Sequence, residues 1–346
     1  MYNNFKNMNN KNLYVNIWLL LITFLLSGII IVGGLTRLTD SGLSITRWDL
    51  ISGIIPPLTL KDWEKSFYLY KQIPEFKLIN FSMTLDEFKI IFWWEYAHRL
   101  LGRILGLFFI LPLIYFTFKK KFKKNLLISL YFIFFLILLQ GLIGWYMVQS
   151  GLTDRTDVSH YRLSVHLTLA FIILISVIWN FLKYNYDLNL LSEKRIPYYL
   201  PHFFLIAILI QISTGALVSG LDAGQIYNTW PLMNESYFPD DSSLNMLYSI
   251  NAFSTPSLVQ FIHRNIAYLI FLIFLLIIYY VFKNSQLYYL KKINLIIFIF
   301  LLFQIALGVL TIVSQAQLFY ASMHQLGSVF LIASSLILVF KNSKFN

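Results

Sequence analysis

Residues 31–48 read IVGGLTRLTDSGLSITRW, and residues 213–230 read STGALVSGLDAGQIYNTW. At an offset of 182 positions the two stretches share a Gly, an Asp, a second Gly and a Trp, in the same order. The matched pairs are Gly33 with Gly215, Asp40 with Asp222, Gly42 with Gly224, and Trp48 with Trp230. Self-similarity at a constant offset is the sign of an internal repeat. We therefore expect two related units in tandem.

The composition identifies the kind of fold that is repeated. Of the 346 residues, 58% are hydrophobic and only 12% are charged, whereas soluble domains carry roughly 45–50% apolar and about 25% charged residues. The net charge of +11 does not indicate nucleic-acid binding, because the Lys and Arg lie between apolar blocks and form no single basic face. The chain is predicted to be an all-α integral membrane protein.

The apolar residues fall into eight blocks, each long enough for the roughly 20 residues that cross a bilayer as a helix. The blocks are residues 13–34, 94–118, 126–148, 163–183, 199–219, 258–282, 293–314 and 320–340. The first block lacks a signal-peptide cleavage pattern, and no Arg-rich presequence precedes it. It is interpreted as a retained span in a protein that is not imported into an organelle.

Lys and Arg concentrate at both termini and in alternate connections, above all in the Lys-rich run at 119–124. By the positive-inside rule these segments are cytoplasmic, so both termini are expected inside. The connection 220–257 contains no Lys or Arg and is expected outside, together with the long loop 35–93. Trp48, Trp63 and the Pro pair at 56–57 indicate that this long loop is ordered.

Further matches between spans extend the repeat. Gln140 and Gly144 in the third span correspond to Gln304 and Gly308 in the seventh. We predict two pseudo-symmetric four-helix bundles in the same orientation, comprising residues 1–195 and 196–346. Each bundle can hold a ligand between facing helices.

Four histidines lie near the starts of the even-numbered spans: His98, His166, His263 and His324. Because these spans all run from outside to inside, the four imidazoles are expected at similar depth, near the outer face. A single His there is more often a hydrogen-bonded boundary residue than a ligand, but four at repeat-related positions favour a function. Two His on different helices of one bundle form the arrangement that holds a haem iron from both sides.

Zinc is the competing metal. Structural zinc sites use closely spaced His together with Cys or carboxylates, but the chain has no Cys and few acids near these histidines. The apolar surroundings suit a macrocycle better. Small residues four positions after each His leave room for a flat ligand: Gly102, Ala170, Ala267 and Ser328. His160 and His202 have no such pattern and are predicted to be structural, although His160 could border the site.

Charged neighbours distinguish the two halves. Arg99 and Arg264 directly follow paired histidines, and each either extends to the interface or clamps a haem propionate. Glu95 precedes His98 by three residues, so the two share a helix face, and its counterpart in the second half is Gln260. A Gln cannot exchange a proton. Glu95 is thus predicted to transfer protons beside a reactive macrocycle in the first half, with a structural Glu as the alternative.

Together these residues strongly resemble the haem A synthase family, which oxidises a methyl group of haem O to a formyl group. The motifs that carry the resemblance are Gly33-Gly34-Leu35-Thr36-Arg37-Leu38-Thr39, Ser41-Gly42-Leu43-Ser44, Glu95-Tyr96-Ala97-His98-Arg99, His166, His263-Arg264 and His324-Gln325. The resemblance covers nearly the whole chain. One branch of the family has a Cys pair in its first outer loop, and this chain resembles the branch without it.

The resemblance implies a role for each site residue. His263 and His324 would ligate the iron of a cofactor haem b, with Arg264 beside it. His98 and His166 would hold the iron of the substrate haem O, with Arg99 beside it. Glu95 would be the catalytic carboxylate. Two successive oxidations of the methyl carbon would give an alcohol and then a hydrated aldehyde, which loses water.

The resemblance also implies haem O synthase and cytochrome oxidase assembly factors as partners, and the inner membrane of a bacterial cell as the location. The sequence does not decide whether the chain forms a homo-oligomer. Two alternative functions also remain open. A dihaem cytochrome b that exchanges electrons with quinone explains four His but leaves the difference between Glu95 and Gln260 unused. A transporter built from parallel repeats predicts polar groups at the bilayer midplane, away from the span ends.

Overall fold

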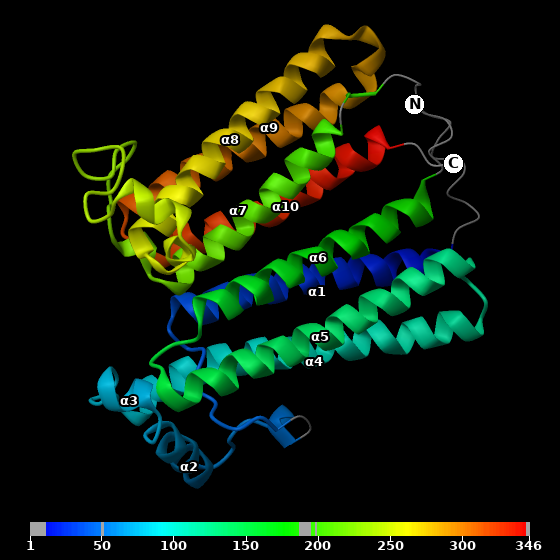
Figure 1. Cartoon of the computed structure of the whole chain (residues 1–346). Coiled ribbons are helices and arrows are strands. Elements are labelled where there is room, and N and C mark those ends of the chain that lie inside the picture. The colour runs from blue at the N-terminus through cyan, green and yellow to red at the C-terminus, as the bar shows by residue number, and fades with distance from the viewer. Residues whose placement is uncertain (1–11, 50–51, 187–194, 198, 344–346) are drawn as a thin grey trace.

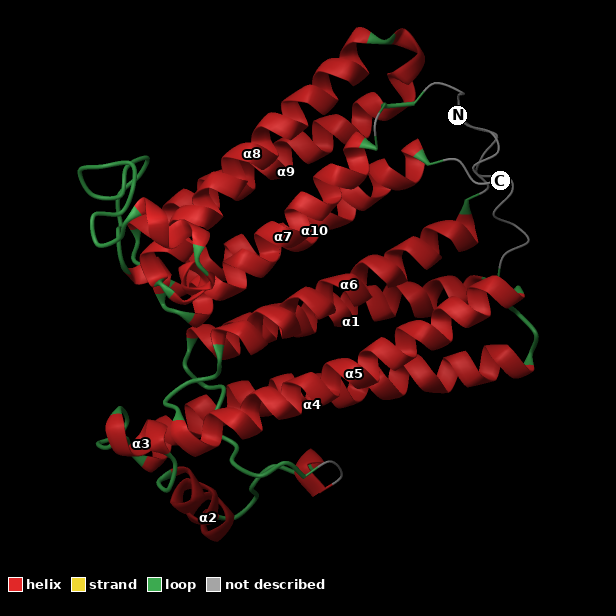
Figure 2. Cartoon of the chain, viewed as in Figure 1, coloured by secondary structure: helices red, strands yellow, loops and turns green. Residues whose placement is uncertain are grey.

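The computed structural model describes residues 12–49, 52–186, 195–197 and 199–343. Across these residues the chain is helical, and no strand is present (Figure 2). Eight helices are long and apolar enough to cross a membrane. They are α1 (Leu13–Leu38), α4 (Leu85–Phe118), α5 (Lys124–Asp154), α6 (His160–Asn185), α7 (Leu200–Gly220), α8 (Pro256–Lys283), α9 (Tyr288–Val313) and α10 (Leu318–Asn342). The predicted all-α membrane fold with eight spans is confirmed.

Several of these helices are longer than the apolar blocks that predicted them. The clearest case is α4, which begins at Leu85, well before the predicted start at residue 94. Thr84 and Glu87 form a reciprocal capping box there, in which each side chain accepts the other residue's backbone N–H. Such a box fixes a helix start in polar sequence, where hydropathy gives no signal. Helix α4 therefore extends beyond its apolar span.

The long helices contact one another in the same pattern in both halves of the chain. In the first half α1 packs on α4, α4 on α5, α5 on α6, and α6 on α1. In the second half α7 packs on α8, α8 on α9, α9 on α10, and α10 on α7. Figure 1 shows the two sets side by side, joined where α6 meets α7 and where α1 meets α10. We call them the first half and the second half.

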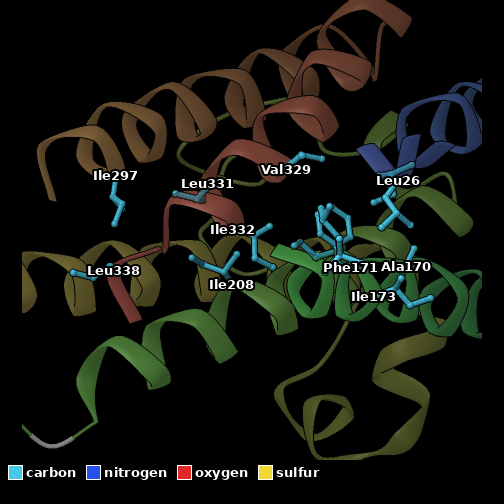
Figure 3. Packing of buried hydrophobic residues seen from close by; sticks show 14 of the residues in the cluster. Leu26, Ala170, Phe171, Ile173, Ile208, Ile297, Val329, Leu331, Ile332 and Leu338 are labelled. Carbon is cyan, nitrogen blue, oxygen red and sulfur yellow. The ribbon is translucent and has the colours of Figure 1, made fainter. Parts of the chain in front are cut away.

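The contact between the halves has an apolar core that is continuous with the interior of each half. One cluster of buried hydrophobic residues includes Leu26 of α1, Phe171 of α6, Ile208 of α7 and Ile332 of α10. Figure 3 shows these side chains meeting between helices of both halves. Burial of apolar surface stabilises at about 25 cal/mol per Å². This shared core therefore contributes to holding the two halves together.

Two long connections lie at one end of the helices, which we call the loop end, while α1 begins and α10 ends at the opposite end (Figure 1). The first connection carries η3 (Ser52–Ile54), α2 (Leu60–Tyr70) and α3 (Pro74–Leu78). The second carries η5 (Ala223–Gln225), η6 (Leu244–Tyr248) and η7 (Ile250–Ser254). A further short helix, η8 (Ser285–Leu287), precedes α9 at the opposite end.

An aromatic cluster fixes α2 and α3 on the first half. Its buried members include Phe67 and Tyr70 of α2, Phe88 and Phe92 of α4, and Leu43 of the first connection. The Phe67 and Phe88 rings stack with centroids 5.1 Å apart. Aromatic pairs of this kind add about 0.5–1.5 kcal/mol beyond area burial. Trp63, one of the residues on which the prediction of an ordered loop rests, packs against the same cluster.

The repeated Asp residues occupy equivalent turns. Asp40 and Asp222 both have left-handed backbone conformations, with φ of 47° and 51°, a region in which Asp is enriched among non-Gly residues. Arg37, mostly buried, pairs with Asp40 at 2.7 Å and with Asp222 of the other half at 2.7 Å. The repeat thus brings its two turns together around one guanidinium.

Candidate functional site

A cavity of about 1540 Å³ opens among the long helices toward the loop end. Its lining comes from both halves and includes all four predicted histidines: His98, His166, His263 and His324. Pockets for a single small molecule usually measure about 300–1,000 Å³. The cavity is therefore large enough for more than one ligand of that size.

The first pair of histidines faces across the first half. The imidazole of His98 on α4 and that of His166 on α6 have ring centroids 6.4 Å apart, with planes inclined by 68°. Two imidazoles that each bind one metal atom at about 2.0–2.1 Å have centroids roughly 6 Å apart. The two rings thus lie at the separation that shared coordination of one metal atom requires.

Each of the four histidines lies against a glycine of a neighbouring helix, and the four glycines are related by the repeat. A Cβ placed on Gly33 would stand 2.7 Å from Cε1 of His98, and one on Gly144 would stand 3.0 Å from Cε1 of His166. The corresponding distances are 3.1 Å from Gly215 to His263 and 3.0 Å from Gly308 to His324. Every imidazole therefore occupies space that only a residue without a side chain leaves open.

Hydrogen bonds fix the His263 ring in the second half. Its Nδ1 lies 3.0 Å from the Thr214 hydroxyl, which donates to the Gln211 carbonyl, so Nδ1 carries the proton. The Gln211 amide nitrogen lies 3.1 Å from Nε2 and also donates to the His263 carbonyl at 3.0 Å. This network assigns the tautomer with a lone pair on Nε2. A ligating His usually donates its other ring N–H in this way.

His324 is held in a similar way. Its Nδ1 lies 3.1 Å from the Gln304 carbonyl, which can only accept, so this nitrogen also carries the proton. The Gln304 amide donates to the His324 carbonyl at 2.8 Å. The second half thus presents two histidines with fixed rings and with Nε2 free of a proton.

The first half lacks this support. His166 keeps the backbone bond from its matching glutamine, Gln140, at 3.0 Å. Its Nδ1, however, has no hydrogen-bond partner among the described residues, and neither has Nδ1 of His98, although His98 lies near the Ile29 carbonyl. At the repeat offset Ile29 stands where the second half has Gln211, and Val32 where it has Thr214. Apolar residues have replaced the two groups that orient His263.

Glu95 is buried at the loop end of the first half, 3% exposed. Its Oε2 accepts from the Ser44 hydroxyl and from the Ile45 backbone N–H, both at 2.7 Å. Its Oε1 pairs with Arg99, one helical turn further along α4. The carboxyl lines the cavity, and its hydrogen bonds also anchor the segment at Ser44 and Ile45 that follows α1.

Gln260 occupies the position in the second half that matches Glu95, but its amide nitrogen donates hydrogen bonds where the Glu95 carboxyl accepts them. Its amide nitrogen donates to the Ala223 and Ile226 carbonyls, both at 2.7 Å, and its oxygen accepts from Arg264 at 2.9 Å. An amide satisfies two carbonyls that a carboxylate would repel. The scaffold is thus the same in both halves, while the group that can exchange a proton is present only in the first.

Arg99 and Arg264 play equivalent parts in that scaffold. Arg99 donates to the Ile45 carbonyl at 2.8 Å and to the Arg47 carbonyl at 3.1 Å. Arg264 donates to the carbonyls of Tyr227 at 2.7 Å and Thr229 at 3.0 Å. Both arginines line the cavity, yet their terminal nitrogens hold the loops that close it. The propionate clamp predicted for them stays a prediction.

The remaining residues named in the sequence analysis fall into two groups: those that line the cavity and those that do not. The four small residues that follow the histidines, Gly102, Ala170, Ala267 and Ser328, all line the cavity. His160 does not line it: it is the first residue of α6, and its backbone packs 2.7 Å from a Cβ placed on Gly220. His202, on α7 at the opposite end, contacts the Tyr199 ring. The structural role expected of both residues stays a prediction.

These residues fit a haem better than a bare metal ion. Within the described parts of the chain, no group of three or more His, Asp or Glu side chains comes together to hold a metal ion. Each half offers two imidazoles and an apolar wall. That donor set matches an iron whose other ligands come from a macrocycle.

The sequence matches the COX15-CtaA family, described as cytochrome oxidase assembly protein, over residues 16–336. The chain belongs to this family. It is also 48% identical over 343 residues to the haem A synthase of Pelagibacter ubique, a match that covers 98% of this chain and 99% of the relative. The haem A synthase of Rhizobium etli is 43% identical over 321 residues, covering 93% and 88%. That of Bartonella tribocorum is 42% identical over 316 residues, covering 90% and 87%.

Membership of the COX15-CtaA family confirms the resemblance that the motifs predict. The structure brings every predicted site residue to one cavity. Sequence reasoning missed three features: the contact of each glycine with its histidine, the pair Gln211 and Thr214, and the buried carboxyl of Glu75. The repeat offset could have pointed to Gln211 and Thr214, because the first half has Ile29 and Val32 at the matching positions. The contact of each glycine with its histidine depends on the packing of two helices. Glu75 carries no repeat signal.

Proposed function

We propose that this protein is a haem A synthase, a membrane oxidoreductase that converts the methyl group on C8 of haem O to a formyl group. The family match and the three relatives named haem A synthase support this activity. The change takes two successive oxidations of one carbon, first to an alcohol and then to a hydrated aldehyde that loses water. The haem A that results serves terminal oxidases.

We assign the two haem positions from the difference in ring support. A resident cofactor needs oriented ligands, and Nδ1 of His263 and of His324 is held by the Thr214 hydroxyl and the Gln304 carbonyl, respectively. An iron bound at Nε2 of His263 would replace the contact of that nitrogen with the Gln211 amide. A haem b held by this pair, with Arg264 beside it, would supply one-electron transfer. A substrate must enter and leave, and His98 and His166 have rings with unpartnered Nδ1 atoms. This pair, with Arg99 beside it, would hold haem O.

Glu95 is the residue that we assign to proton transfer. It lies one turn from His98, lines the cavity and has no acidic counterpart in the second half. Conversion of a methyl to a formyl group removes two hydrogens from the carbon, so a group that exchanges protons is needed beside the substrate. Its bonds to Ser44, Ile45 and Arg99 hold it in place for this role.

The proposed activity also includes a membrane location, an orientation and partners for the protein. The chain is a multi-pass membrane protein. We place it in the bacterial cytoplasmic (inner) membrane with both termini in the cytoplasm, as the positive-inside rule predicts, so that both haem positions lie near the outer face. Haem O synthase is the proposed supplier of substrate, and cytochrome oxidase assembly factors are proposed to receive the product.

The experiment that tests the activity is identification of the haems made by cells that express the chain and supply haem O. Formyl haem should accumulate with the wild-type protein. Glu95→Gln, which copies Gln260, should lower its formation by about 10²–10⁴-fold, the usual contribution of acid–base catalysis, while the absorption of the resident haem stays. A purified protein that contains haem but yields no formyl haem would favour the dihaem cytochrome instead.

A further inference from the structure

The first connection carries a buried acid to which neither the repeat nor the family motifs assign a role. Glu75 belongs to the short helix α3, which packs against α5, and only 5% of its surface is exposed. Glu75 and Glu95 are the two buried carboxyl residues among those that the structure describes. Both line the cavity.

The Glu75 carboxyl is only partly satisfied by hydrogen bonds. Its Oε1 accepts a long bond of 3.4 Å from the Asn80 amide, which makes a shorter bond of 2.8 Å to the Tyr70 hydroxyl. Its Oε2 has no hydrogen-bond partner in the described structure. A buried polar atom without a partner costs about 1–3 kcal/mol. Burial of Glu75 at this position therefore costs stability and does not add to it.

The charges that face Glu75 are all of its own sign. They come from Glu95 of α4, from Asp40 after α1 and from Asp157 before α6, while a hydrogen bond from the Tyr70 hydroxyl of α2 favours the ionised carboxyl and acts against them. Burial first, and then the Glu95 carboxylate, raise the pKa of Glu75 to about 8. Glu95, by contrast, has Arg99 as a direct partner. The two buried acids of the cavity thus differ: among the described residues Glu95 forms an ion pair, whereas Glu75 does not.

The second half has nothing comparable. The acids of its loop, Asp222, Glu235, Asp240 and Asp241, are all exposed. Helices α2 and α3 have no counterpart there, so the buried acid comes with an insertion that only the first half carries. Both the ion-paired and the unpaired carboxyl lie on the side where we place the substrate.

We propose that Glu75 is a second proton-exchange residue of the enzyme, which passes protons between the loop end and the part of the cavity that Glu95 lines. The inference rests on the proposed haem A synthase activity. Two hydrogens leave the methyl carbon in each full conversion, and a single carboxyl held in an ion pair must be reset between the two oxidations. Glu75 takes or returns a proton at its unpaired Oε2, and no other bond forms or breaks there.

The test measures formyl haem formation from haem O in membranes that contain the full-length protein, from about pH 6 to about pH 9. Glu75→Gln keeps the shape but cannot ionise, and should lower the rate roughly 10²-fold, near the lower end of the range for acid–base catalysis. It should also abolish the dependence of the rate on pH near 8. Glu75→Asp should restore a large part of the rate. Glu64→Gln, an exposed acid of α2, serves as the matched control and should change nothing.

The outcomes separate the two proposals. If the wild-type protein makes no formyl haem, the proposed activity fails. If it does and Glu75→Gln retains both the rate and the pH profile, the role of Glu75 is wrong. If the Gln and Asp variants lose the rate equally, side-chain length and not acidity matters at this position, which also overturns the role. The absorption of the resident haem in each variant reports whether the protein is intact.

Discussion

The two histidine pairs of the cavity occupy equivalent places but are built differently. Both pairs lie against repeat-related glycines. In the second half Thr214, Gln211 and Gln304 fix the ring nitrogens, whereas in the first half Nδ1 of both rings has no partner among the described residues. The group beside the first histidine differs in the other direction: the first half has the acid Glu95, whereas the second half has the amide Gln260 at the matching position. The two halves thus share the placement of their histidines against glycines, and they differ in the groups around the rings and in the acid on the helix face, which is the difference on which we base the proposed division of roles.

The strongest test of this comparison removes one ligand from each half. His263→Ala should abolish binding of the resident haem, because the remaining His324 cannot hold the iron from both sides. His98→Ala should leave that haem in place and stop product formation. The measurement is the absorption spectrum of the purified protein, together with its extracted haems.

His202→Ala is the matched control, since this histidine contacts Tyr199 at the other end of α7 and not the cavity. It should leave both spectrum and product unchanged. Equal loss of the resident haem from the His98 and His263 variants would contradict the division of roles. An unaltered spectrum in His263→Ala would exclude this residue as a ligand.

A smaller effect is expected when the second half is converted to resemble the first. Thr214→Val with Gln211→Ile introduces the residues found at Val32 and Ile29, and removes the partners of both His263 ring nitrogens. Loss of groups that orient a ligating His typically weakens metal binding 10–100-fold. Haem retention on dilution should fall by a similar factor.

A single substitution elsewhere in α7 serves as the control for general disturbance of the helix. Ser213→Ala lies one residue away and removes a contact with Ser164 that does not touch the cavity histidines. It should retain the haem like the wild type. If the double variant also does so, ring support does not explain why one half holds its haem more firmly.

Much of this arrangement could be predicted from the sequence, since the features that carry it are periodic. Hydropathy located eight spans, a constant offset of 182 positions located the repeated Gly, Asp and Trp residues, and the matching places of the four histidines in their spans aligned Glu95 with Gln260. The remainder depends on contacts between distant segments. Glu75 lies in a polar stretch with no repeat partner, and it becomes buried only because Phe67 and Tyr70 pack on Phe88. The extension of α4 to Leu85 likewise depends on a local cap.

The smallest predicted effect concerns the glycines, and it probes how freely each imidazole can move. Gly33→Ala places a methyl 2.7 Å from His98, while Gly215→Ala places one 3.1 Å from His263. Overpacking typically destabilises by about 1–3 kcal/mol. The His98 ring has no side-chain hydrogen bond to hold it and should shift, so that product formation falls while the midpoint of thermal unfolding drops only slightly. The His263 ring is fixed by two partners, and there the strain should appear as lost stability.

Gly28→Ala on α1 is the control, because its added methyl meets nothing within 4 Å and should stabilise the helix by up to about 1 kcal/mol. If Gly33→Ala and Gly215→Ala behave alike in both measurements, the two rings are equally constrained, and the distinction between a fixed and a mobile pair is wrong.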